Sequence, residues 1–81
     1  MAEFAFEETT EGWLFRVITR GASLPRYFIV GAGEREEAQL LVEAEPDVRG
    51  DRVEVVGRVS VLNMMQFEVR AGEVKQVDAP P

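Results

Sequence analysis

Residues 26–45 limit the fold more than any other stretch, because they predict a strand, a glycine turn and a helix in direct succession. The run Tyr-Phe-Ile-Val at 27–30 is aromatic and β-branched, which suits a buried strand. Gly31 and Gly33 then end the strand, and three glutamates favour the start of a helix at about Glu34. Apolar residues recur at helical spacing until Pro46 stops the helix. A strand that leads directly into a helix predicts an α+β fold.

Two further segments have the alternating pattern of strands, residues 13–20 and residues 52–59. The helix lies between the strands at 27–30 and 52–59, so these two should run parallel, joined by a right-handed connection. Residues 13–20 carry apolar side chains on both faces, which places this strand at the centre with the other two as its neighbours. We therefore expect a small mixed β-sheet with one main helix packed on a face, in the order β-β-α-β plus a short C-terminal helix.

The segment at residues 60–67 has two interpretations. Ser60 is a good helix cap, and the apolar residues after it have helical spacing. Met65, Phe67 and Val69 also alternate as they would in a strand. We favour the short helix.

The chain of 81 residues is long enough for a single domain, residues 1–81, with a small core. Phe4 and Phe6 alternate with other residues near the start, so residues 1–11 fit either a short edge strand or a flexible segment. At the other end we expect a short extended tail at residues 73–77. Residues 78–81 should be a disordered tail.

Composition excludes several classes of function. The chain has no Cys and no His, so we expect no zinc, haem or iron–sulfur site, no other cofactor and no enzymatic activity of the usual nucleophile-and-base kind. No catalytic residue and no metal ligand is proposed. The formal net charge of −6 disfavours nucleic acid as a partner. No apolar stretch is long enough for a membrane span, and the acidic start of the chain differs from a signal peptide, so we expect a cytoplasmic protein.

Three arginines near the expected hairpin are candidates for a small anion or carboxylate site: Arg16, Arg20 and Arg26. The glycine turn at Gly31 and Gly33 is a second candidate, since a turn between a strand and a helix N-terminus can hold a phosphate. A glutamate stands where the third glycine of that fingerprint would be. A solvated strand face and a simple tight turn are the plainer interpretations, and we favour both of them.

Two segments together resemble certain short uncharacterised bacterial proteins of unknown function. The first is Arg-Tyr-Phe-Ile-Val at 26–30, followed by Glu-Glu-Ala at 36–38. The second is residues 67–75, which resemble the end of those proteins, where a small helix precedes a leucine, a basic residue and Pro-Gly-Glu-Val. Ala71 stands here in place of that proline. The resemblance supports the short helix after Ser60 and implies no activity. The richness of the chain in Ala, Arg, Val, Gly and Glu favours a bacterial origin.

One main helix and one short helix cover little of a sheet, and uncovered apolar surface marks an interaction site. Edge strands also invite pairing with another chain. We therefore expect a small non-enzymatic module that binds protein, either itself as a homodimer or a larger complex. The alternative is a regulatory domain that binds a small ligand or anion. The residues expected on the uncovered sheet face are Leu14 and Ile18, with Phe28 or Val30 depending on the register.

Overall fold

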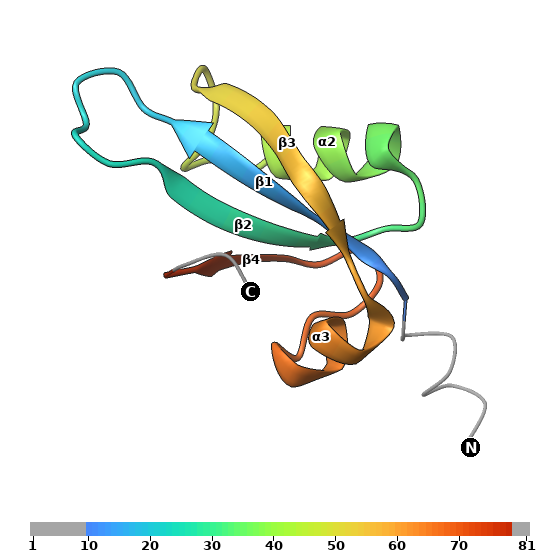
Figure 1. The fold of residues 1–81 in the computed structure, drawn as a ribbon. Coiled ribbons are helices and arrows are strands. Elements are labelled where there is room, and N and C mark those ends of the chain that lie inside the picture. The colour runs from blue at the N-terminus through green and yellow to red at the C-terminus, as the bar shows by residue number, and fades with distance from the viewer. Residues whose placement is uncertain (1–9, 79–81) are drawn as a thin grey trace.

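The computed structural model describes residues 10–78, which form a small α+β fold of one sheet and two helices (Figure 1). The fold class agrees with the sequence prediction. The expectations for the two ends of the chain concern mostly residues 1–9 and 79–81, which lie outside the described residues. In chain order, the elements are β1 (Gly12–Ile18), β2 (Arg26–Gly31), α2 (Arg35–Glu43), β3 (Arg52–Val59), α3 (Val61–Gln66) and β4 (Val74–Val77).

The strands lie side by side in the order β3-β1-β2-β4. As predicted, β1 lies between β2 and β3, which run in the same direction. The prediction of a mixed sheet is wrong, however, because all three pairs of neighbouring strands are antiparallel. The reason is that β1 pairs with β2 as a hairpin and takes the position beside β2 that a parallel β3 would need. The crossover through α2 must therefore carry the chain past β1 to its far edge.

The segment expected as an extended tail is a strand, β4, which pairs with β2. In this ladder Val30 lies opposite Val74, and Tyr27 lies opposite Val77. Two polar residues separate the two valines of β4, so its pattern is too short to predict a strand. β4 lies beside β2 because residues 70–73, just before it, dock against the end of β2 at Gly31.

Helix α2 covers one face of the sheet (Figure 1). It begins after Glu34, which is its N-cap and makes no side-chain capping bond. Two of its residues, Ala38 and Val42, are fully buried. The core on this face, which we call the α2-side core, consists of Phe15, Val17, Phe28, Val30, Ala32, Ala38, Val42 and Val48.

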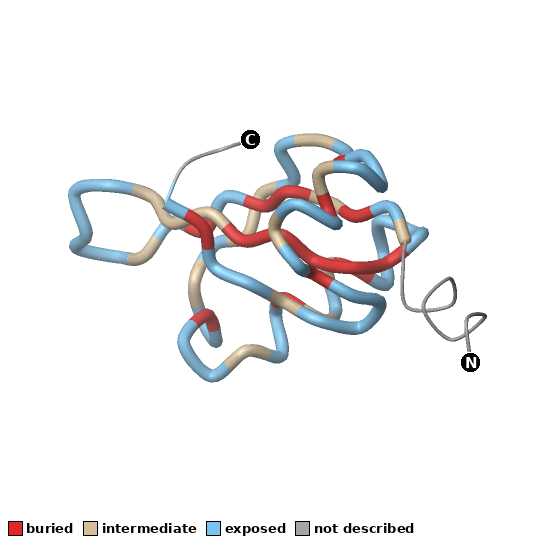
Figure 2. The backbone as a smooth tube through the Cα atoms, turned by 90° about the horizontal axis from the view of Figure 1, so that it is seen from below, coloured by how far each residue is buried: buried red, intermediate tan, exposed pale blue. Residues whose placement is uncertain are grey.

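Helix α3 confirms the favoured interpretation of residues 60–67. The Ser60 hydroxyl accepts a hydrogen bond of 3.2 Å from the backbone N–H of Asn63, which caps the helix. Met64 points inward and is fully buried. A second core lies on this face, the α3-side core, made of Leu14, Ile29, Val59, Met64, Val69 and Val77. Figure 2 shows most of the buried stretches along the middle of the molecule, with exposed stretches around them.

Candidate interaction surface

Strand β3 is an edge strand over its whole length, since in the described part of the chain its only ladder is with β1. The peptide groups along its outer side therefore have no strand partner among residues 10–78. The strand is eight residues long, and the opposite edge strand β4 is four. Val55 and Val56 are 41% and 48% exposed. β3 contains no Lys and no Pro, but three of its side chains, Arg52, Glu54 and Arg58, are charged, and charged side chains also limit pairing at an edge.

A β-bulge divides β3 into two parts. Leu14 lies opposite Gly57 and Phe15 lies opposite Val55, so Val56 is an extra residue without a partner on β1. A bulge bends the strand and interrupts regular pairing. Residues 52–55, which we call the β3 edge segment, are the regular part before the bulge.

Side chains of the β3 edge segment alternate between the two faces of the sheet. Val53 lies opposite Val17, and Val55 lies opposite Phe15, so both valines are on the α2 side. Glu54 lies opposite Arg16 on the other face. No helix covers that face at this end, because α3 lies at the other end of the sheet (Figure 1).

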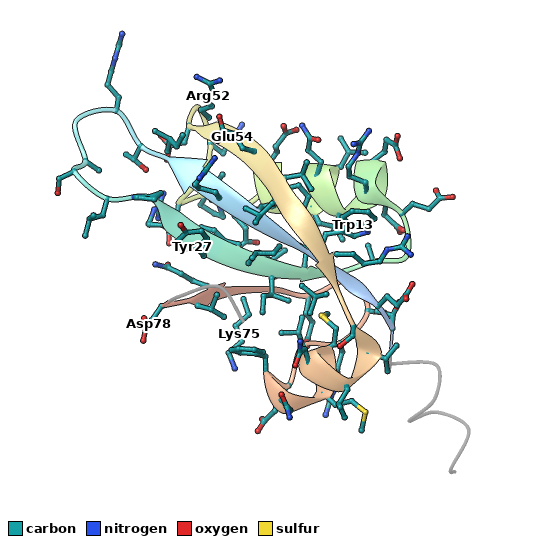
Figure 3. All side chains as sticks on the ribbon, in the orientation of Figure 1. Trp13, Tyr27, Arg52, Glu54, Lys75 and Asp78 are labelled. Carbon is teal, nitrogen blue, oxygen red and sulfur yellow. The ribbon has the colours of Figure 1, made fainter. Side chains whose placement is uncertain are left out.

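We call this uncovered part of the sheet, on the side of Arg16 and Glu54, the half-face. On it, the Glu54 carboxylate lies between two arginines. Arg16 Nη2 and Nε donate to Glu54 Oε1 at 2.8 and 3.1 Å, and Arg52 Nε lies 3.0 Å from Glu54 Oε2. Glu54 raises the pKa of Arg16 above its ordinary value, through the hydrogen bond first and then through its charge. Figure 3 shows Arg52 and Glu54 together on β3, at the end of the sheet away from α3. Two arginines and one glutamate leave this cluster positively charged, within a chain whose net charge is −6.

The β1–β2 loop borders the half-face with a shallow hollow of about 240 Å³. Ile18 is 39% exposed in this hollow, and Leu24 is 77% exposed. The hollow is lined by Arg16, Ile18, Ala22, Ser23, Leu24 and Pro25. Because Ile18 lies opposite Arg52 in the ladder, the hollow is continuous with the β3 edge segment.

The three arginines predicted to form an anion site do not converge. Arg16 is on the uncovered half-face, and Glu54 already pairs with it. Arg26 lies opposite Val17 on the α2 side, and Arg20 is exposed in the β1–β2 loop. Arg16 and Arg26 therefore lie on opposite faces of the hairpin, because side chains alternate between the two faces along each strand.

Arg26 joins the β1–β2 hairpin to the loop before β3. Its Nη2 donates to the backbone oxygen of Asp47 at 2.8 Å, to Asp51 Oδ2 at 3.0 Å and to the Thr19 hydroxyl at 3.2 Å. Thr19 in turn donates to the same Asp51 oxygen at 2.9 Å. This arginine therefore has its carboxylate partner within the fold, and its contacts indicate a structural role.

Arg26→Ala should lower the free energy of unfolding by about 1–3 kcal/mol, because charge-assisted hydrogen bonds are lost and Asp51 is left without its cation. Urea unfolding followed by circular dichroism measures this change. Arg20→Ala is the matched control, since Arg20 is exposed, and its effect should stay within about 0.5 kcal/mol. Equal effects of the two substitutions would contradict the structural role of Arg26.

The glycine turn serves packing. The Gly31 N–H donates to the Glu73 carbonyl at 2.9 Å, and the Gly31 carbonyl accepts from the Gly72 N–H at 2.7 Å. A Cβ on Gly31 would overlap the carbonyl of Arg70, so the chain at residues 70–73 fills the space beside this glycine. Gly33 has open space around it and belongs to the turn before α2. The structure therefore shows no phosphate cradle formed by both glycines.

Of the four residues expected on an uncovered face, only Ile18 is exposed. Leu14, Phe28 and Val30 are at most 5% exposed and belong to the two cores. The expectation is wrong for these three because both faces are covered at that end of the sheet. Sequence reasoning missed the β3 edge segment. Its signal was the alternation Arg-Val-Glu-Val at residues 52–55, on a strand that could lie at an edge.

The chain has no significant match among family models, curated proteins or solved structures. Within residues 10–78, no group of acidic side chains is arranged to hold a metal ion. Neither of the helices seen in that part of the chain has the length and hydrophobicity to cross a membrane.

Proposed function

We propose that this protein is a small non-enzymatic interaction module that binds another protein along the β3 edge segment. The observation that carries the proposal is the open edge itself, whose regular part before the bulge has Val55 exposed and contains no Lys or Pro. A strand added to such an edge gains main-chain hydrogen bonds, and pockets beside the edge select its side chains. The half-face with Arg16, Glu54 and the hollow at Ile18 supplies that adjacent surface.

Binding of a small anion has less support. A free anion site needs cations without a carboxylate partner, and both Arg16 and Arg26 have one.

The absence of Cys and the acidic composition are in keeping with a cytoplasmic setting, which we propose as well.

Affinity capture with two bait variants tests the proposal. Val55→Lys places a charge on the edge and should block pairing, because lysine at an edge strand opposes strand addition. Leu62→Lys is the matched control, since Leu62 is an exposed apolar residue of α3, away from β3. We expect the wild type and Leu62→Lys to retain the same partner, either a second copy or another protein. Val55→Lys should retain at least about tenfold less, equivalent to about 1.4 kcal/mol.

Circular dichroism of each bait establishes that it is folded, which both substitutions should allow because both side chains are exposed. A folded Val55→Lys bait that retains the partner as well as the wild type would overturn the proposal. So would loss of the partner with Leu62→Lys alone.

A further inference from the structure

The charges along β3 indicate which partner the edge accepts. We propose that the β3 edge segment pairs with the same segment of a second copy, antiparallel, with Val53 opposite the partner's Val53. The inference rests on the proposed function, because it names the occupant of the same edge. The two sheets would then continue into one another across a two-fold axis.

Two-fold symmetry restricts the registers that are available. In an antiparallel pair, directly opposed residues share a face of the sheet, so the axis must pass beside one residue of the segment. The candidates for this central residue are Arg52, Val53, Glu54 and Val55. Each choice fixes every other opposed pair.

The charged residues of β3 favour one of these registers over the others. An axis at Arg52 places two arginines opposite each other, and an axis at Glu54 places two glutamates opposite each other; like charges in such positions are destabilising. An axis at Val55 would extend the ladder through the bulge at Val56. An axis at Val53 places Arg52 opposite the partner's Glu54 on both sides. Only this register pairs unlike charges and keeps to the regular part of β3.

The surroundings of the segment fit this register. The Arg52 side chain is 75% exposed, so it can extend toward a second carboxylate without leaving a buried site. The cluster of Arg16, Glu54 and Arg52 carries one surplus positive charge in each copy, so two copies together carry a surplus of two. Within the pair, each Arg52 gains the Glu54 of the second copy as an additional neighbour of opposite charge. On the α2 side, the two Val53 side chains would contact each other across the axis.

A single cysteine tests the register directly, because the chain contains no Cys. Opposed residues of an antiparallel pair have Cα atoms about 4.5–5.5 Å apart, within the range of about 4.4–6.8 Å that a disulfide needs. Val53→Cys should therefore form a covalent dimer under mild oxidation. Val55→Cys is the control, since the two copies of Val55 would be offset by roughly 13 Å along the strands. Dimers at both positions, or at neither, would overturn the inference.

Charge reversal in the Val53→Cys background provides a second test. Arg52→Glu alone opposes glutamates, and Glu54→Arg alone opposes arginines, so each variant by itself should cross-link at least about tenfold less. A mixture of the two should restore cross-linking as a mixed dimer, because every opposed pair is again of unlike charge. Sedimentation and mass spectrometry identify the mixed species. A mixture that fails to cross-link would overturn the inference.

The two proposals fail in different ways. If Val53→Cys remains monomeric while Val55→Lys still loses a captured protein, the second copy is the wrong occupant and the edge is still the binding site. If Val55→Lys captures as the wild type does and no cross-link forms, both proposals fail.

Discussion

Replacing Gly31 with alanine is expected to destabilise the protein by about 3 kcal/mol or more, because the added Cβ meets backbone that cannot move away like a flexible side chain. The obstacle is the carbonyl of Arg70. Moving that segment away would also strain the two hydrogen bonds that join Gly31 to Gly72 and Glu73. These bonds lead the chain into β4, so the ladder between β2 and β4 should weaken as well.

Gly33→Ala is the control for this prediction. Nothing lies within 4 Å of a Cβ built on Gly33, and its φ is outside the left-handed region. Alanine there should change the free energy of unfolding by less than about 1 kcal/mol. Urea unfolding of the two variants gives the comparison. A Gly31→Ala protein as stable as the Gly33→Ala protein would show that residues 70–73 do not dock against the end of β2.

Replacing Met64 with alanine should cost about 2–5 kcal/mol, the usual range for a fully buried methionine. Met64 is 0% exposed and is the one residue of α3 that enters the α3-side core. It also packs over Gly12 so closely that a Cβ on that glycine would overlap its sulfur. Loss of the side chain should therefore release α3 from the start of β1.

The neighbouring Met65 supplies the matched control, because it is 59% exposed on the same helix. Met65→Ala should stay within about 0.5 kcal/mol of the wild type in the free energy of unfolding. Thermal unfolding followed by circular dichroism measures both variants. If Met65→Ala proved the more harmful of the two, the orientation of α3 described above would be wrong.

Local patterns predicted most of the elements. The strands β1, β2 and β3 follow from alternating or β-branched runs, and α2 follows from apolar residues at helical spacing after a glycine turn. Ser60 correctly predicted the start of α3, since its hydroxyl accepts a hydrogen bond from the N–H of Asn63, three residues later. These features depend on residues close together in the chain, so the sequence shows them directly.

Features that depend on distant residues were not predicted. The pairing of β4 with β2 depends on how residues 70–73 dock against Gly31, which no local pattern shows. The register places Phe28 in the α2-side core and Leu14 in the α3-side core, so neither forms the expected interaction face.

The candidate site was missed for the same reason. Whether β3 is an edge or a central strand is decided by strand order, which is a property of the whole sheet. One of the two arginines that contact Glu54 is Arg16, which comes from β1, 38 residues earlier in the chain. The sequence could indicate that some edge was open to a partner, but it could not indicate which one.

The concentration dependence of the backbone amide chemical shifts tests the central claim most directly, since it reports each residue of the unmodified protein. If copies pair through the β3 edge segment, shifts should change with concentration at residues 52–55 and, more weakly, at the facing residues of β1. The amides of α2 and α3 should stay constant. Shifts that do not change up to millimolar concentration, or that change around α3 instead, would contradict pairing of two copies through β3.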